Sequence, residues 1–262
     1  MDIQAIIFDK DGTLLDFDAF WIAVSVYAIK DMLKQLGRGD IPVDEFLDVL
    51  GVHNGRTAAD GILCKGTYEQ MGLAIYDVLK SHGIDILPEE TVRMTIDAYT
   101  RNADAGEVRP TCENIREILE RIKARGIKLL VVTTDNYEIT HKCLVELGIE
   151  DLFEKIYTDD GKTPVKPDPQ CVSEFSQSFG IPAGKIIMVG DTMTDIRFAR
   201  NAGIFAVCVG SSAETGKCAD AFISDISHIF EVIGEDKQYW LTVFLRGFSG
   251  RWKQLFWGLH YL

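Results

Sequence analysis

The sequence predicts an α/β fold in which helices cover a parallel sheet, with a helical cap domain inserted after the first strand. From residue 111 onward, short apolar runs alternate with helical patterns. Strands without polar alternation are typical of a parallel sheet that is covered on both faces. Between residues 16 and 104 we find helical periodicity only. A chain of 262 residues is long enough for such a core and a second, smaller domain.

The first predicted strand, residues 3–8, leads directly into two acids, Asp9 and Asp11. Their i, i+2 spacing points both side chains to the same side of an extended chain. Gly12 then allows a sharp turn and a close approach to a ligand. Two like charges about 4 Å apart repel by about 4 kcal/mol at an effective dielectric constant of about 20. We therefore expect a hard divalent cation with oxygen ligands here.

A calcium loop or a plain surface turn could also explain this D-x-D-G stretch. An EF-hand loop requires Gly at its sixth position and Glu at its twelfth. Counted from Asp9, those positions hold Leu14 and Phe20, which excludes the EF-hand. The surface turn stays open at this point, because Asp and Gly both favour turns.

Helical patterns dominate the insertion. The predicted helices cover residues 17–36, 43–50, 67–82 and 89–102. Pro88 followed by two glutamates is typical of a helix start, where the ring and the acids are both favoured. We expect no strand between residues 16 and 104, and a return linker over residues 104–110.

The rest of the chain predicts the remaining strands and helices of a Rossmann-like sheet. Predicted strands cover residues 127–133, 153–157, 186–189, 204–209 and 221–223, and predicted helices cover 111–125, 137–147, 168–179, 193–202 and 225–233. We expect Thr111 to cap the first of these helices. The predicted domains are a core of residues 1–15 and 105–234, a helical cap of residues 16–104, and a C-terminal extension of residues 235–262.

Polar side chains follow several strands at their carboxyl ends. They are Asp9, Asp11, Thr133, Lys166, Asp191 and Asp195. In a parallel sheet these positions meet at one edge, which is where such sheets bind their ligands. Carboxylates, a lysine and a hydroxyl suit a phosphoryl group bound together with magnesium.

In this order and setting, the segments resemble the four motifs of the haloacid dehalogenase (HAD) superfamily. The matching residues are Asp9-Lys10-Asp11-Gly12-Thr13, then Thr133, then Lys166 in a K-P-x-P setting, then Asp191 and Asp195 in G-D-T-x-x-D. The chain is similar to phosphoglycolate-phosphatase-like members from residue 3 to about 233, and the insertion is similar to their C1 cap. Thr134 departs from the family pattern, which often has Asn after the hydroxyl of Thr133.

The resemblance implies a magnesium-dependent phosphatase that acts on a small phosphorylated metabolite, such as phosphoglycolate or a sugar phosphate. Asp9 is then the nucleophile that forms an aspartyl-phosphate. Asp11 is the acid that protonates the leaving alcohol and the base that activates water. Thr133 and Lys166 hold the phosphoryl group, and Lys166 also faces Asp9.

The resemblance also implies the ligands of the Mg2+ ion. They are the Asp9 carboxylate, the backbone carbonyl of Asp11, and Asp191. Asp195 is expected to orient Lys166 or a metal-bound water.

Some of these residues have simpler interpretations. Thr133 could only terminate a strand, and Asp195 could be an ordinary acid in the first turn of a helix. Lys162 competes with Lys166 but lacks the K-P-x-P context. Arg56 is a candidate for binding an anionic leaving group, although exposed arginines are common.

Other functions are compatible with parts of the pattern. A phosphomutase uses the same core, and a phosphonate hydrolase would need a cap lysine as a Schiff-base amine. The cap offers Lys30, Lys34, Lys65 and Lys80, of which none stands out. A dehalogenase normally lacks the acid at Asp11. The presence of Asp9, Asp11, Lys166 and Asp191 argues against a catalytically silent regulatory or scaffold module, whereas the unusual C-terminal extension keeps that alternative open.

Composition excludes several further classes of protein. The net charge of −13 argues against nucleic acid as a partner. The six cysteines show no metal or disulfide spacing, which is typical of a reducing compartment. We find no apolar run of the ~18 residues that a membrane span requires, and no signal-peptide pattern. We therefore expect a cytoplasmic enzyme.

The C-terminal extension has an unusual composition. It is rich in aromatic residues and has no acid after Asp236, but it carries Lys237, Arg246, Arg251 and Lys253. A helix there would have one apolar stripe. Three interpretations remain open: docking on the acidic body or a partner subunit, contact with an anionic membrane surface, and a non-native extension.

Overall fold

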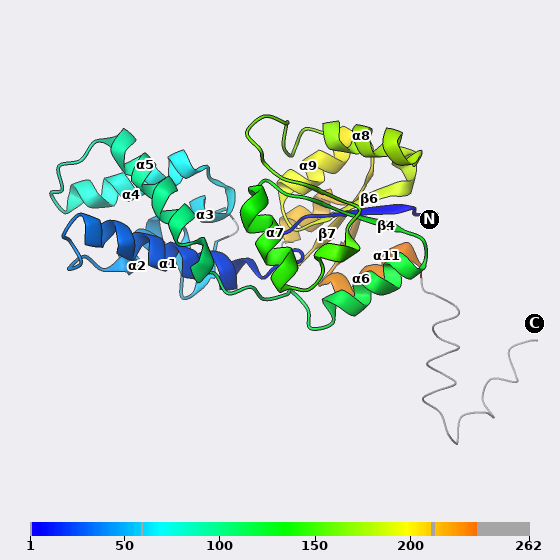
Figure 1. Ribbon diagram of the computed structural model, residues 1–262, viewed down its shortest axis with the longest axis horizontal. Helices are drawn as coiled ribbons and strands as arrows, with labels where there is room; N and C mark the ends of the chain where they lie inside the picture. The colour runs from blue at the N-terminus through cyan, green and yellow to red at the C-terminus, as the bar shows by residue number, and fades with distance from the viewer. Residues whose placement is uncertain (1, 59, 211–212, 235–262) are drawn as a thin grey trace, which may run out of the picture.

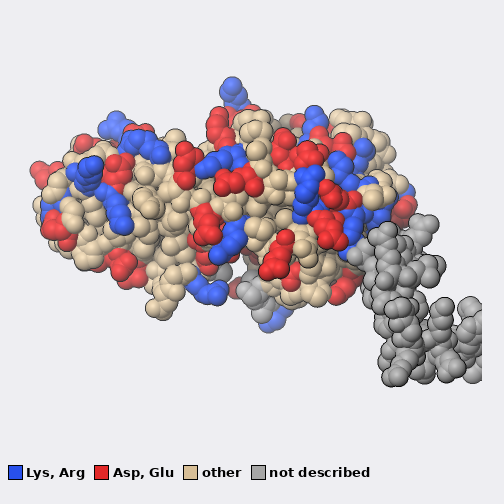
Figure 2. All heavy atoms as spheres, turned by 60° about the horizontal axis from the view of Figure 1, so that its bottom comes forward, with Lys and Arg blue, Asp and Glu red and all other residues tan. Residues whose placement is uncertain are grey.

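The computed structural model describes residues 2–58, 60–210 and 213–234, so the predictions for the extension at 235–262 lie outside it. Figure 1 shows a helical body beside an α/β body, with the first strand inside the latter. On the face in Figure 2, Lys and Arg side chains lie among Asp and Glu side chains instead of forming one continuous basic patch. Within the described ranges, no helix has both the length and the apolar character to cross a membrane.

A six-stranded parallel sheet forms the α/β body, and its order is β5-β4-β1-β6-β7-β8. The strands are β1 (Ala5–Phe8), β4 (Lys128–Val132), β5 (Lys155–Tyr157), β6 (Ile186–Gly190), β7 (Phe205–Val209) and β8 (Ala221–Ile223). β1 is central: Phe8 pairs with Val131 of β4 on one side and with Val189 of β6 on the other. The loops that follow these three strands therefore lie next to one another at one edge. The predicted fold class is confirmed.

Helices cover both faces of the sheet (Figure 1). They are α6 (Ile115–Ala124), α7 (Tyr137–Glu146), α8 (Gln170–Phe179), α9 (Met193–Ala202), α10 (Ala213–Cys218) and α11 (Ile229–Ile233). Alternate residues of β1 pack into different apolar clusters. Ile6 and Phe8 join the cluster that contains residues of α6 and α11, whereas Ala5 and Ile7 join the cluster that contains residues of α8 and α9. Burial on both faces explains why β1 has no polar alternation.

The helical body is the cap, and it is inserted between β1 and α6. Its helices are α1 (Phe17–Gln35), α2 (Val43–Val49), α3 (Ile62–Lys65), α4 (Tyr68–Ser81) and α5 (Pro88–Arg101). The cap has its own apolar core, which includes the fully buried Phe20 and also takes in Ile139 and Cys143 of α7. The cap is thus a separate layer that packs against one helix of the α/β body.

The two chain segments that join the cap to the core run side by side. The backbone N–H of Asp16 donates to the carbonyl of Arg109 at 2.8 Å, and their side chains form an ion pair at 2.9 Å. The N–H of Thr111 donates to the carbonyl of Leu14 at 3.1 Å. The hydroxyl of Thr111 donates to the carbonyl of Thr13 at 2.6 Å. The segment that leads from the cap back to the core is therefore hydrogen-bonded directly to the loop that follows β1.

Three local predictions were wrong or incomplete. Thr111 does not cap a helix, because α6 begins at Ile115 and the Thr111 hydroxyl is used in the hydrogen bond just described. The cap is not free of strands, since β2 (Val52–His53) and β3 (Arg56–Thr57) form a hairpin. Its two-residue strands are too short to show periodicity, although Asn54-Gly55, both at positive φ, is a typical hairpin turn. The short helices α3 and α10 were not predicted.

The contact between α4 and α5 predicts whether replacing Gly72 stabilises or destabilises the protein. A Cβ atom on Gly72 would lie 2.7 Å from the Cα of Val92. Gly to Ala in an exposed helix normally stabilises by about 1 kcal/mol. Here we expect Gly72→Ala to lower the free energy of unfolding by about 1–3 kcal/mol, because the backbone of α5 at Val92 must move to make room for the methyl group. Chemical denaturation measures it.

Gly216→Ala is the matched control, because the nearest atom there belongs to the movable ring of Phe222, at 3.0 Å. We expect a smaller loss or a gain for this variant. A Gly72→Ala protein as stable as the unsubstituted protein would contradict the described packing.

Candidate active site

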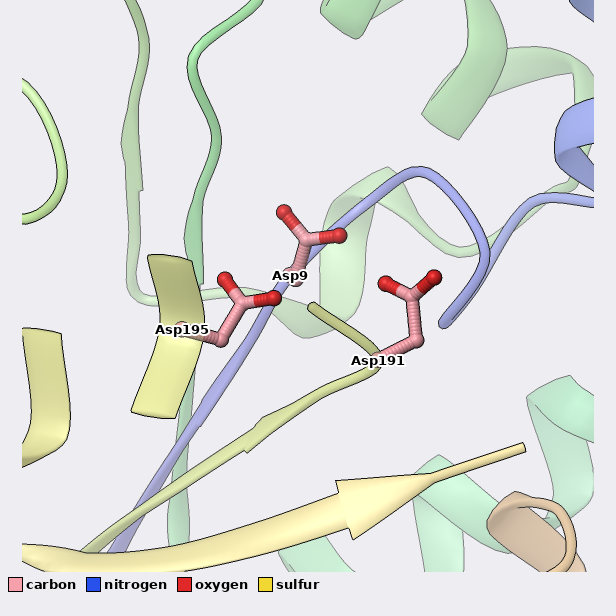
Figure 3. Close-up of side chains that lie close together, drawn as sticks. All are labelled: Asp9, Asp191 and Asp195. Carbon is pink, nitrogen blue, oxygen red and sulfur yellow. The ribbon is translucent and has the colours of Figure 1, made fainter. Parts of the chain in front are cut away.

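Three acids meet at the carboxyl edge of the sheet (Figure 3). Asp9 follows β1, Asp191 follows β6, and Asp195 lies in the first turn of α9. One carboxylate oxygen from each lies within 4.8 Å of the other two. The position of β1 between β4 and β6 explains this meeting, because segments far apart in the sequence leave the sheet side by side.

Lys166 joins two of these acids. Its Nζ donates to Oδ1 of Asp9 at 2.5 Å and to Oδ1 of Asp195 at 2.6 Å. Lys166 is buried, whereas the alternative Lys162 is exposed and has no contact with the acids among the described interactions. The lysine fixes one oxygen of Asp9 and leaves the other for chemistry or for a cation.

Asp195 serves the lysine and its own helix at once. Its Oδ2 accepts the N–H of Thr192 at 3.0 Å and the hydroxyl of Thr192 at 2.6 Å, which closes a capping box at the start of α9. With Oδ1 bonded to Lys166, both oxygens of Asp195 have partners. The geometry therefore favours Asp195 as the residue that orients Lys166.

Asp191 lies against a glycine. Its Oδ1 is buried and has no hydrogen-bond partner. A Cβ atom on Gly12 would lie 2.3 Å from Oδ2 of Asp191, so only glycine leaves room for this carboxylate. Gly12 also has a φ of +76°, which L side chains rarely adopt.

The electrostatics of the cluster favour a bound cation. Burial raises the pKa of Asp9 to about 7 and raises the pKa of Asp191 well above its usual value. Burial lowers the pKa of Lys166, but the charges of Asp195 and Asp9 outweigh that and raise it. When all three carboxylates are ionised, they and the ammonium group of Lys166 together carry a net charge of −2. An all-oxygen donor set with an unpartnered buried oxygen therefore fits a hard divalent cation.

Thr133 follows β4 at the same edge and is 3% exposed. Its Oγ1 accepts the N–H of Asp135 at 3.2 Å, which leaves the hydroxyl proton free to be donated elsewhere. In contrast, Arg56 of the cap hairpin is exposed, and no described interaction links it to the acids.

The carboxylate of Asp11 lies outside the three-acid cluster. Its Oδ1 accepts Nζ of Lys10 at 2.8 Å and Nε1 of Trp21 at 3.0 Å. Lys10 also forms an ion pair with Asp135 at 3.1 Å. The sequence analysis gave no role to Lys10, Trp21 or Asp135. The available signal was a lysine placed directly after a buried strand, where it needs a charged partner.

The sequence of this chain matches the family of haloacid dehalogenase-like hydrolases over residues 3–203. The chain belongs to this family. The match extends from β1 to the end of α9 and so includes all the residues of the cluster.

Individual relatives are more distant. The chain is 26% identical over 204 residues to a phosphoglycolate phosphatase of Psychrobacter arcticus, which covers 78% of this chain and 82% of the relative. It is 29% identical over 210 residues to a phosphoglycolate phosphatase of Neisseria gonorrhoeae, covering 79% and 80%.

Solved structures support the fold. A crystal structure described as a predicted phosphoglycolate phosphatase from Haemophilus somnus aligns with a TM-score of 0.65 and 22% identity, covering 89% of this chain and 99% of that one. A HAD-superfamily hydrolase of subfamily IA from Geobacter sulfurreducens aligns with a TM-score of 0.64 and 20% identity, covering 89% and 97%.

The contact between Gly12 and Asp191 gives a prediction for the site. Gly12→Ala must displace the Asp191 carboxylate in addition to straining the backbone. If the cluster binds a divalent cation, the cation should raise the melting temperature of the unsubstituted protein, and we expect Gly12→Ala to lose that rise. Thermal denaturation with and without the cation measures this.

Gly126→Ala is the matched control. Gly126 has nearly the same φ, +77°, but nothing lies within 4 Å of its Cβ position. It should lose about 1–2 kcal/mol of stability from the left-handed backbone and keep the response to the cation. An intact response in Gly12→Ala would argue against Asp191 as a ligand.

Proposed function

We propose that this hydrolase is a magnesium-dependent phosphatase that acts on a small phosphorylated metabolite through an aspartyl-phosphate. The observation that carries the proposal is the buried Asp9 carboxylate, held by Lys166 at 2.5 Å beside the buried Oδ1 of Asp191, which has no hydrogen-bond partner. A nucleophile, a positive charge and a cation site within one cluster form the arrangement that phosphoryl transfer requires.

Asp9 would use the oxygen that Lys166 leaves free to form a bond to phosphorus. The P–O bond to the leaving alcohol breaks in the same step, and that oxygen receives a proton from Asp11. Water then forms the new bond to phosphorus, the bond to Asp9 breaks, and Asp11 takes up the water proton. The products are the alcohol and inorganic phosphate, so Asp9 and Asp11 return to their starting states.

Charge neutralisation is the main requirement, because an anionic nucleophile approaches an anionic substrate. Lys166 supplies one positive charge, and the Thr133 hydroxyl would donate to a phosphoryl oxygen. Mg2+ held by Asp9, the Asp11 carbonyl and Asp191 would supply the remaining positive charge. Asp195 would keep Lys166 in place through their bond of 2.6 Å.

The relatives suggest which substrates to test first. Both curated relatives described above are phosphoglycolate phosphatases, at 26% and 29% identity. The cap would select the substrate by closing over the carboxyl edge of the sheet. We propose phosphoglycolate and sugar phosphates as the first class, and an aryl phosphate as the probe of the chemistry.

Replacing the nucleophile gives the direct test. We expect Mg2+-dependent hydrolysis of an aryl phosphate by the unsubstituted protein and a loss of at least about 1000-fold in Asp9→Asn, since an amide oxygen cannot replace the carboxylate. Chelator should abolish turnover.

Asp85→Asn, an exposed acid of the cap, is the control and should retain activity. Failure of the unsubstituted protein to hydrolyse aryl phosphate, phosphoglycolate or sugar phosphates, together with no stabilisation by beryllofluoride and Mg2+, would refute the proposal.

The raised pKa of Asp9 predicts how pH and Mg2+ act together on stability. The pKa of Asp9 is about 7 in the folded protein, against an ordinary value of 3.8. Between these values the folded state binds more protons, so the contribution of Asp9 to stability falls as pH rises toward 7. Mg2+ must displace that proton, and its stabilising effect should therefore grow with pH.

The measurement is the shift of the melting temperature on adding Mg2+, at pH 5, 6, 7 and 8. We expect a small shift at pH 5 and a large one at pH 8. A shift that is equal at all four pH values would show that protons and the cation do not compete in this cluster.

A further inference from the structure

Lys10 is a fully buried lysine that the proposed chemistry at Asp9 does not use. Its exposure is 0%, and its Nζ lies 2.8 Å from Oδ1 of Asp11 and 3.1 Å from Oδ2 of Asp135. Lysine is rarely buried completely, because removing its charge from water costs several kcal/mol unless partners offset the loss. A residue of this kind calls for a specific role.

Lys10 is the meeting point of three elements. Lys10 and Asp11 belong to the loop after β1, and Asp135 follows β4. Trp21 belongs to α1, the first helix of the cap. The Nζ of Lys10 also lies 5.6 Å from the ring centre of Phe20 and 5.9 Å from that of Trp21, close enough for cation–π attraction.

Two donors hold the same oxygen of Asp11. Lys10 donates from the core and Trp21 donates from the cap, and both bonds end on Oδ1. Among the described residues, none donates to Oδ2, and the side chain of Asp11 is 18% exposed. A carboxylate fixed through one oxygen presents the other in a defined direction, as proton transfer to a substrate requires.

We propose that Lys10 is a positioning residue: together with Trp21 it holds Oδ1 of Asp11 so that Oδ2 exchanges protons with the leaving alcohol and with water. The inference rests on the proposed phosphatase function and adds a specific requirement to it. Lys10 touches neither substrate nor phosphorus, and it acts only through Asp11.

A purely structural role is the competing explanation. Lys10 could simply neutralise Asp135 and attach the cap to the core. Lys10→Met would remove both the ion pair with Asp135 and the N–H donated to Asp11. It should lose stability, because Asp135 keeps its charge without a partner. Only the positioning role, however, makes the loss of activity depend on the leaving group. Lys10→Met therefore distinguishes the two roles, because it fills the space but donates nothing to Asp11.

The experiment compares two leaving groups. A nitrophenyl phosphate has a good leaving group that needs no proton, whereas phosphoglycolate, or whichever alkyl phosphate the unsubstituted enzyme turns over best, needs one. For Lys10→Met we expect kcat/KM to fall about 100-fold with the alkyl phosphate and less than about 3-fold with the aryl phosphate. KM for the alkyl phosphate should change little.

The second half-reaction gives an independent signature. Water attack needs Asp11 as a base, so the aspartyl-phosphate should accumulate when Asp11 is misplaced. With the aryl phosphate, Lys10→Met should release about one equivalent of nitrophenol rapidly and then turn over slowly. A structural defect would instead lower the amplitude of the nitrophenol burst, and it would lower the rate of turnover of both substrates equally.

Further variants separate the possible failures. Asp11→Asn should show the same two signatures more strongly, and Lys10→Met/Asp11→Asn should be no worse than Asp11→Asn alone, because both act through one group. Trp21→Phe removes only the indole N–H and should show a weaker form of the pattern. Asp135→Asn keeps both donors to Asp11 and should resemble the unsubstituted enzyme.

Equal losses with the two leaving groups in Lys10→Met and Trp21→Phe would overturn the inference and leave the phosphatase intact. If Asp11→Asn itself shows no preference for the aryl phosphate, the proposed role of Asp11 fails, and the inference fails with it. If Lys10→Met does not fold, as judged by circular dichroism, Trp21→Phe decides by the same two measurements.

Discussion

The bonds from Lys166 to Asp9 and Asp195 are the interaction on which the rest of the site depends. They place a positive charge inside the sheet edge, where Asp9 and Asp195 are 7% and 1% exposed. Without that charge, Asp9 and its neighbouring acids would be buried together with only repulsion between them. The capping box of α9 fixes Asp195, Asp195 fixes Lys166, and Lys166 fixes one oxygen of Asp9. The first turn of α9 and the candidate nucleophile Asp9 are thus linked through the two hydrogen bonds that Lys166 donates.

Much of this could be predicted from the sequence, because in a parallel sheet strand order alone brings strand ends together. Asp9, Thr133 and Asp191 directly follow apolar strands, so their shared edge needed no knowledge of distant contacts. The helices of the cap were predicted well from local signals: α1 and α4 have apolar residues at helical spacing over 14 or more residues, and α5 begins with Pro88 and two glutamates. The hairpin β2–β3 has no such period in its two-residue strands.

What could not be predicted depends on contacts between elements that local patterns do not reveal. The partner of Lys10 on the cap, Trp21, looks like any aromatic residue on an apolar helix face. Thr111 has the composition of a helix cap, but tertiary structure uses its hydroxyl to hold the Thr13 carbonyl instead. Asp11 shares its motif with Asp9, yet its carboxylate is directed toward different partners. The roles of such residues follow only from the folded chain.

The paired segments that join the cap to the core have a consequence for how this chain could diversify. Because the N–H of Thr111 already bonds to the carbonyl of Leu14, the residues before and after the insertion are neighbours whatever lies between them. The insertion is therefore exchangeable in principle: a different helical module could enter and leave at the same two points without altering the sheet or Lys166. Such an exchange would remove Trp21, and with it one of the two donors to Asp11. A transplanted module would have to supply an equivalent N–H. The contact of Asp9 with Lys166 lies within the α/β core and would survive the exchange, whereas one of the two contacts that hold Asp11 comes from the cap.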